Sequence, residues 1–213
     1  MYDDENKLAE EMRPLTEDEM KTLTVLAEKG DGKAQLRLGQ AFLFEKVVPD
    51  YSKAYRYFRK AVEQDVVRAY YYLGELYYHG WGIARNLDSA IECFETAADD
   101  GDMDAEYALG MMYLYGNDAL PRDMERALDY LESAANKGQP QSYNVLGSVF
   151  DEGTCVDRDP FKARQFYARG VAAGDAVALK NLTLLEAKER ANGTKGWIPG
   201  DIVEGEEEEE SEE

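Results

Sequence analysis

Few residues in this chain of 213 have side chains that could carry out chemistry, and they are scattered along it. His79 is the one histidine, and the cysteines are Cys93 and Cys155. A zinc site needs several histidine or cysteine ligands, so an isolated imidazole argues against a metal site. No nucleophile elbow, zinc-protease helix, phosphate loop or paired-carboxylate motif occurs in the sequence. We therefore predict that the chain is not an enzyme and has no catalytic residue, no metal and no cofactor.

The alternative, an enzyme, would require titrating groups that converge around His79 or Cys155. The many aspartates and glutamates are better explained as helix caps and solvated faces. Cys93 falls at a core position of a predicted helix, whereas Cys155 falls in a later loop, so we do not expect a disulfide between them. These residues thus do not indicate catalysis. The helices that carry them are more informative about function.

A repeated pattern organises the chain. Each copy has a small residue, then Leu-Gly starting four positions later, then an aromatic residue three positions after the glycine. The copies are Ala34, Leu38, Gly39, Phe42; Ala69, Leu73, Gly74, Tyr77; Ala105, Leu109, Gly110, Tyr113; and Ser142, Leu146, Gly147, Phe150. Self-similarity at such a period predicts stacked helical hairpins, and arrays of this kind usually bind other molecules.

A second alanine follows each Leu-Gly pair and marks the second helix of each hairpin. These alanines are Ala54, Ala90, Ala127 and Ala163. Each stands 15 residues before the small residue of the next copy or before Ala178, whereas the distance back to the glycine varies from 15 to 17 residues. The constant spacing predicts a tightly packed junction between hairpins, and the variable spacing predicts a loop that tolerates insertion. Four residues before each second alanine stands a residue suited to cap a helix: Asp50, Asn86, Asp123 or Asp159.

Half units close the array at both ends. Thr16 and Glu19 have the spacing of a capping box, and Thr183 stands where the last copy should have its glycine. We predict an acidic segment over 1–15, a cap over 16–29, repeats over about 31–65, 66–101, 102–138 and 139–174, a second cap over 176–191, and a flexible acidic tail over 192–213.

The pattern resembles the Sel-one-like (Sel1-like) repeat family, which is related to the tetratricopeptide repeats. The second copy carries the resemblance most fully, with Ala69, Leu73, Gly74, Tyr77, Gly80, Gly82, Ile83, Asp88, Ala90, Phe94, Ala97, Ala98 and Gly101. Copy one departs from it with Glu45 in place of the loop glycine, and copy four has Cys155 where copy two has Gly82. The resemblance implies an all-α fold, a right-handed α-α superhelix (solenoid) of four helical hairpins with capping helices. It also implies an adaptor or scaffold role and no common reaction.

The related tetratricopeptide geometry implies a concave face lined by the first helix of each hairpin. Carried over to this sequence, it predicts the partner-binding residues Tyr71, Glu75, Tyr78, His79, Tyr107, Met111, Leu114, Tyr115, Asp151 and Glu152. Tyrosine offers a large, stiff surface with a hydrogen-bonding tip, which suits recognition. The alternative is that these aromatic residues simply pack between adjacent helices. Trp81, in the loop of the second copy, is predicted to be a contact residue or to fold back onto its hairpin.

The formal charge of −20 is concentrated at the ends of the chain. Residues 1–19 carry −6 and residues 201–213 carry −9, which leaves −5 for residues 20–200. This distribution disfavours nucleic acid and anionic membranes, whose binding needs clustered Lys and Arg. The sequence has no basic, apolar start typical of a signal peptide and no long apolar run, so we expect a cytoplasmic protein; a secreted bacterial effector without a cleaved signal is the alternative.

Two hypotheses for function follow. The first is a non-enzymatic adaptor that binds an extended or helical partner peptide in its concave groove, with Glu75, Asp151 and Glu152 favouring a cationic ligand. The second is a dedicated inhibitor, immunity protein or chaperone that masks a basic partner with the help of the acidic tail. The tail also carries the apolar residues Trp197, Ile198 and Val203, which would dock on the last repeat or serve as a linear motif.

Overall fold

The computed structural model describes residues 13–44, 48–153 and 156–191 of the chain. Within these ranges the structure consists of ten α-helices and no strand. They are α2 (Glu17–Glu28), α3 (Gly32–Leu43), α4 (Tyr51–Val62), α5 (Val67–His79), α6 (Leu87–Asp99), α7 (Met103–Tyr115), α8 (Met124–Asn136), α9 (Pro140–Glu152), α10 (Pro160–Ala172) and α11 (Ala176–Ala191). The all-α fold predicted from the sequence is confirmed.

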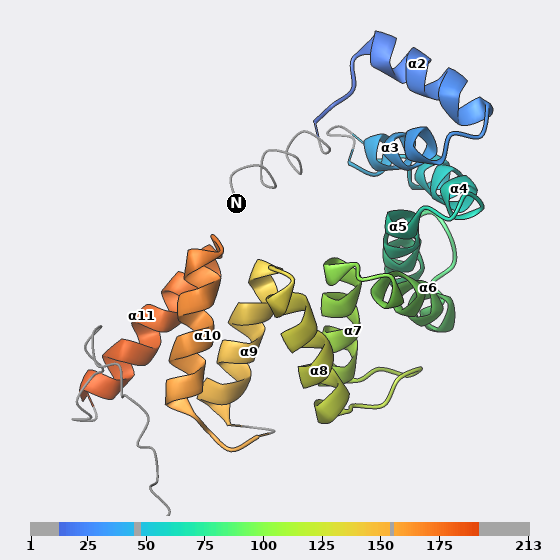
Figure 1. Cartoon of the computed structure of the whole chain (residues 1–213). Helices are drawn as coiled ribbons and strands as arrows, with labels where there is room; N and C mark the ends of the chain where they lie inside the picture. Colours follow the sequence, from blue (N-terminus) through green and yellow to red (C-terminus); the bar gives the residue numbers. More distant parts are fainter. Residues whose placement is uncertain (1–12, 45–47, 154–155, 192–213) are drawn as a thin grey trace, which may run out of the picture.

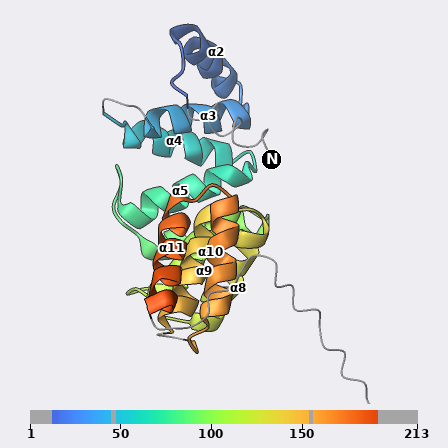
Figure 2. The same cartoon turned by 90° about the vertical axis from the view of Figure 1, so that its left-hand side faces the viewer.

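The helices form successive hairpins that follow a curved path (Figure 1). Helices α3 and α5 lie on the inner side of the curve, and their hairpin partners α4 and α6 lie on the outer side (Figure 1). The next two hairpins repeat this order, so we call their first helices, α7 and α9, inner and their second helices, α8 and α10, outer. The hairpin α9–α10 continues the array, while α2 and α11 close its two ends. In the perpendicular view, α3, α4 and α5 run across the picture whereas α9, α10 and α11 stand upright, so the helix direction turns along the array (Figure 2). This turning makes the array a superhelix.

Polar caps set where the outer helices begin. The side chains of Asp50, Asn86, Asp123 and Asp159 each accept a hydrogen bond from a backbone N–H in the first turn of the helix that follows, at 2.9–3.1 Å. These bonds satisfy amides that have no partner within the helix. Thr16 and Glu19 form the predicted capping box at the start of α2.

A residue with left-handed backbone conformation follows each of the helices α2, α4, α6, α8 and α10. Gly30, Gly101, Gly138 and Gly174 have φ between 88° and 99°, which costs glycine little because it has no Cβ. Asp65 takes the same place after α4 and is the one described non-glycine residue with positive φ, at 55°. The fixed spacing between hairpins therefore has a backbone cause as well as a packing cause.

The Leu-Gly glycines let the two helices of a hairpin approach closely. A Cβ added to Gly39, Gly74 or Gly147 would lie 2.4–2.5 Å from the nearest ring atom of Phe58, Phe94 or Tyr167 respectively. In the third hairpin a Cβ on Gly110 would lie 2.7 Å from Leu131 Cγ. Each glycine thus leaves room for the large residue that stands four positions after the second alanine of its hairpin.

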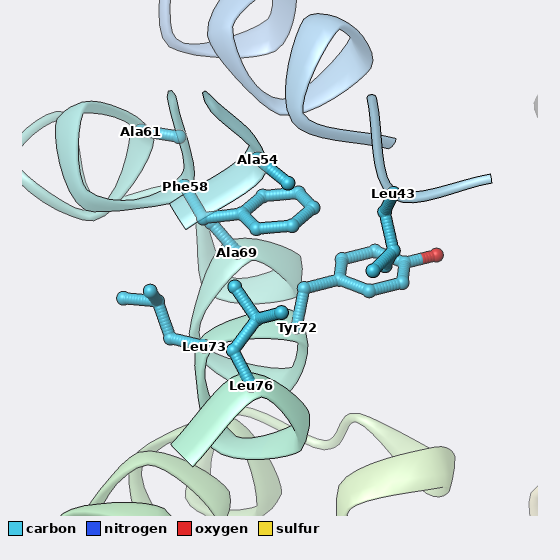
Figure 3. Packing of buried hydrophobic residues seen from close by; sticks show 8 residues of the cluster. All are labelled: Leu43, Ala54, Phe58, Ala61, Ala69, Tyr72, Leu73 and Leu76. Carbon is cyan, nitrogen blue, oxygen red and sulfur yellow. The ribbon is translucent and has the colours of Figure 1, made fainter. Parts of the chain in front are cut away.

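The core continues across the junctions between hairpins. Phe58 of α4 stacks on Tyr72 of α5 with ring centroids 4.9 Å apart, and the alanines Ala54, Ala61 and Ala69 close the space around the rings (Figure 3). These alanines are fully buried. Large rings surrounded by alanine make each interface dense, and buried clusters of this kind follow one another along the array.

The aromatic residue of the repeat pattern also has a structural role. Phe42, Tyr113 and Phe150 each stack on an aromatic ring of the partner helix at 5.7–5.8 Å and within 8° of parallel. In the second hairpin Cys93 stands where this partner ring would be. Tyr77 accordingly turns to another partner, and its hydroxyl lies 3.0 Å from that of Tyr55 on α4. The pattern aromatics are therefore packing residues.

Candidate binding pocket between α5 and α7

A pocket of about 290 Å³ lies between the inner helices α5 and α7, with Phe94 of α6 contributing to its wall. It is lined by Tyr71, Glu75, Tyr78, Phe94, Asp104, Tyr107, Ala108, Met111, Met112, Tyr115, Gly116 and Asn117. The α5 residues are spaced by four and three positions, so they share one face of the helix. Residues that pack into the core, such as Leu73 and Leu76, occupy the other side of α5. The hairpin packing thus leaves an aromatic stripe for the pocket.

The tyrosines differ in how far they are available to a ligand. Tyr71 is half-buried and packs edge-on against Tyr72, with ring centroids 5.2 Å apart, and near Phe94, at 6.0 Å. Burial raises the pKa of Tyr71 well above its ordinary value, so its phenol stays protonated. Tyr107 is also half-buried, whereas Tyr115 at the end of α7 is 73% exposed. Tyr71 and Tyr107 are walls of the pocket, and Tyr115 is a residue of its rim.

Glu75 is the carboxylate that lies within this aromatic surface. Its side chain is 25% exposed, and burial, reinforced by the charge of Asp104 and opposed by Arg68, raises its pKa from 4.5 to about 7. Its one contact of ion-pair type in the described structure is with His79 Nε2, at 3.6 Å. Burial and the neighbouring Arg85 lower the pKa of His79, so this imidazole is neutral at pH 7 and does not balance the carboxylate.

The second carboxylate of the pocket, Asp104, is already paired. Arg68 Nη2 lies 2.6 Å from Asp104, and Nη1 of the same guanidinium lies 2.8 Å from Asp102. Asp102 also caps α7 by accepting hydrogen bonds from the N–H groups of Asp104 and Ala105, at 3.1 and 3.0 Å. Arg68 is therefore held by two aspartates at the start of α7 and is not the counter-ion of Glu75.

The structure brings six of the predicted partner-binding residues together in this pocket and places the other four elsewhere. The six are Tyr71, Glu75, Tyr78, Tyr107, Met111 and Tyr115. For Leu114 the prediction is wrong: it is only 6% exposed and belongs to the buried cluster with Leu146 and Val149 of α9. The next hairpin covers this position, which removes it from the surface. Asp151 bonds Arg158 at 3.0 Å and Lys188 at 3.3 Å, and Glu152 is exposed at the end of α9.

His79 and Trp81 form an aromatic stack beside the pocket. The His79 ring lies parallel to the Trp81 indole with centroids 4.2 Å apart, and the indole stacks in turn on Tyr51 of α4 at 5.3 Å. Trp81 is 37% exposed, so it folds back onto its hairpin and the preceding one while keeping part of its surface open. Neither residue lines the pocket.

Sequence reasoning missed half of the lining, namely Phe94, Asp104, Ala108, Met112, Gly116 and Asn117. Phe94 is a core residue of the repeat, only 1% exposed, that contributes to the wall of the pocket. Asp104 stands in the first turn of α7, where an acidic residue is already explained by its favourable interaction with the helix dipole. The spacing of Asp104, Ala108 and Met111 places the three on one face of a helix, and it is the one sequence signal that groups the missed residues Asp104 and Ala108 with the predicted Met111.

The described residues contain no group of three histidine, cysteine, aspartate or glutamate side chains arranged to hold a metal ion. Burial raises the pKa of the Cys93 thiol to about 11, so it is a packing residue in its thiol form. Cys155, Glu45 and the acidic tail with Trp197, Ile198 and Val203 lie outside the described residues. Among the helices that are described, none is long and apolar enough to cross a membrane.

Comparison with known proteins agrees with the repeat period. Four successive segments, 32–66, 67–102, 104–139 and 140–175, match the Sel1 repeat. The chain also resembles the crystal structure of a Sel1 repeat protein from Oxalobacter formigenes, with a TM-score of 0.73 and 26% sequence identity. That likeness covers 81% of this chain and 72% of the other.

Two curated relatives are longer proteins. An uncharacterized protein of Neisseria meningitidis, NMB1327, is 31% identical over 157 residues, which are 73% of this chain and 32% of the relative. The mouse DAP3-binding cell death enhancer 1 is 32% identical over 174 residues, covering 64% of this chain and 34% of the relative. The chain thus spans about a third of the length of each of these relatives.

Proposed function

The chain belongs to the Sel1 repeat family, and from that premise we propose that it is a non-enzymatic adaptor that binds a segment of a partner protein in the pocket between α5 and α7. The observation that carries the proposal is the pocket lining. Three tyrosines of the inner helices, Tyr78, Tyr107 and Tyr115, stand with Met111 around a cavity on the side of α5 and α7 that the hairpins leave uncovered. Aromatic and methionine side chains in a concave site are typical of protein recognition.

The size of the pocket favours a side chain of a peptide over a free metabolite. Sites for small molecules usually enclose about 300–1,000 Å³, and this cavity of about 290 Å³ is at or below that range. The pocket suits one anchoring side chain, while the rest of an extended or helical segment would lie along the inner helices. The name of the mouse relative describes a protein that binds DAP3, and binding of a protein partner is the feature that we carry over to this chain.

The test is a comparison of three proteins as bait in lysate of the organism from which the sequence comes. Tyr78→Ala with Tyr115→Ala removes ring surface from the pocket and its rim, and Phe161→Ala removes a 58% exposed ring from the outer helix α10. Tyr71 is left in place because it also packs against core rings. Anchoring aromatic residues typically contribute 2 kcal/mol or more, so we expect the double variant to bind about thirtyfold more weakly.

Proteins captured by the wild type and by Phe161→Ala but lost from the double variant would be identified by mass spectrometry and measured again in purified form. Circular dichroism must show the same helix content for all three baits. A partner that binds the double variant and the wild type equally would contradict the proposal.

A further inference from the structure

The pocket has a chemical preference beyond its shape. Building on the proposed function, we infer that it accepts one cationic side chain of the partner segment, an arginine or a lysine, with Glu75 as its counter-ion and the surrounding tyrosine rings as its walls. Glu75, in contrast to the other acidic residues predicted to bind a partner, would then select the ligand.

The pairing of the carboxylates supports this role. Asp104 is bonded by Arg68, and Asp151 is bonded by Arg158 and Lys188. Glu75 is the pocket carboxylate for which the described structure provides no lysine or arginine partner. A carboxylate that is largely removed from water without a partner costs free energy, and a bound cation would relieve that cost. Arg68, whose charge also acts on Glu75, is shared with Asp102 and Asp104, so carboxylates outnumber cations here.

The walls of the pocket also suit a cation. Tyrosine rings attract ammonium and guanidinium groups to their faces, and the effect grows when water is excluded. Two tyrosines of the pocket already have such contacts: Arg68 lies 4.5 Å from the Tyr71 ring centroid and Arg85 lies 5.9 Å from that of Tyr78. The other ring walls, for which no such contact is formed within the described residues, are those of Tyr107 and Tyr115. Met111, Met112 and Ala108 supply apolar surface for the methylene groups of the ligand. An aromatic pocket with one carboxylate therefore matches both parts of an arginine or lysine side chain.

Other occupants fit less well. A purely apolar side chain would cover Glu75 further without balancing its charge, which raises the desolvation cost. An acidic side chain would meet Glu75 and Asp104 together and be repelled. Charge complementarity accordingly selects a basic residue.

Binding through Glu75 has a definite dependence on pH. The titratable and charged groups around it are Arg68, Tyr71, Tyr78 and His79 on α5, Arg85 in the loop after α5, and Asp104, Tyr107 and Tyr115 on α7. Burial raises the pKa of Glu75 to about 7, and only the ionised form attracts a cation. Affinity for a basic side chain should therefore be highest above pH 7 and should fall as the pH is lowered through 6.

The first experiment uses methyl groups of the pocket as probes. In protein labelled with ¹³C-methyl methionine, the signals of Met111 and Met112 report on the pocket, while those of Met20 and Met124 report on other helices. The ligands are the acetylated amides of arginine, lysine and citrulline; citrulline has nearly the shape of arginine without its charge. We expect the arginine and lysine compounds to shift Met111 and Met112 with roughly millimolar affinity and citrulline to shift them far less.

Two variants make the experiment specific. Glu75→Gln keeps the shape of the side chain and removes its charge, and we expect it to weaken binding of the arginine compound about tenfold or more. Glu132→Gln makes the same change at an exposed position of the outer helix α8 and should leave binding unchanged. Equal shifts with citrulline and arginine, no shift at Met111 and Met112, or equal binding by wild type and Glu75→Gln would overturn the inference.

A second experiment distinguishes this inference from the proposed function. Random peptides of about twelve residues displayed on phage are selected on the wild type, then tested against Glu75→Gln and against the Tyr78→Ala, Tyr115→Ala double variant. The inference requires selected peptides that contain an arginine or lysine and bind Glu75→Gln at least about tenfold more weakly. Peptides that depend on the two tyrosines but not on Glu75 would refute the inference alone. Peptides that depend on neither would refute the proposed function as well.

Discussion

Replacing Glu75 by glutamine should make the protein more stable, and by an amount that depends on pH. The wild-type carboxylate has a pKa raised from 4.5 to about 7 by burial and by Asp104, so folding disfavours its ionised form. Below pH 4.5 the group is protonated in both the folded and unfolded states, and the substitution changes little. As the pH rises through 7, the folded wild type must hold a charge that the unfolded chain would hydrate more readily. Stability is therefore lost with rising pH, and the glutamine variant escapes this loss.

Linkage between protonation and folding gives the magnitude. With these two pKa values, the ionised side chain destabilises the wild type by about 1 kcal/mol at pH 5 and about 3 kcal/mol at pH 8.5. Because only 25% of the side chain is exposed, solvent screens little of this effect. We expect Glu75→Gln to exceed the wild type in free energy of unfolding by these amounts at the two pH values.

Urea unfolding followed by circular dichroism at pH 5, 7 and 8.5 measures this difference directly. Glu132→Gln, on an exposed site of α8, is the matched control and should show no dependence on pH. If Glu75→Gln differed from the wild type by the same amount at all three pH values, or were less stable at pH 8.5, the description of Glu75 as an uncompensated carboxylate would be wrong. A stabilising change that also removes binding of a cation would identify Glu75 as a residue kept for function.

Three further substitutions or modifications test the account of the fold. Gly147→Ala should destabilise the protein by about 1–3 kcal/mol in urea unfolding, because its Cβ would lie 2.5 Å from the Tyr167 ring; an unchanged midpoint would contradict the close approach of α9 and α10. Arg68→Ala should lower stability by about 2 kcal/mol or more, since Asp102, whose side chain is only 8% exposed, would lose its partner; a loss that vanishes in Arg68→Lys would show that charge alone suffices. Cys93 is half-buried and its pKa is raised to about 11 by burial, so it should react with iodoacetamide at pH 8 much more slowly in the folded protein than in urea, once the other cysteine is changed to serine; equally fast labelling of the folded and unfolded protein would contradict this.

The fold was predictable from the sequence because its determinants are local or repeated. Asp50 and its counterparts cap helices within three residues, and the glycines that end helices act on their own backbone. The periodic Leu-Gly pairs indicated hairpins. The reason for the glycine itself required coordinates, because only they show the Phe58 ring against Gly39.

The pocket was predictable only in part. Helical spacing placed Tyr71, Glu75 and Tyr78 on one face of a helix. Whether a residue on that face stays open depends on the next hairpin, and α9 covers Leu114 for that reason. The charge state of the site depends on still longer connections: Arg68 bonds Asp102, 34 residues further along the chain, and no spacing rule reveals such a pair.

We propose that a partner protein binds in the pocket between α5 and α7. The most direct measurement replaces Tyr115, which is 73% exposed at the pocket rim, by the photo-crosslinking amino acid benzoylphenylalanine, and makes the same replacement at Phe161 on α10. On irradiation in the presence of a partner, we expect a covalent adduct from position 115, mapped by mass spectrometry to a segment with a basic residue, and none from position 161. Adducts from position 161 but not from position 115 would contradict the claim.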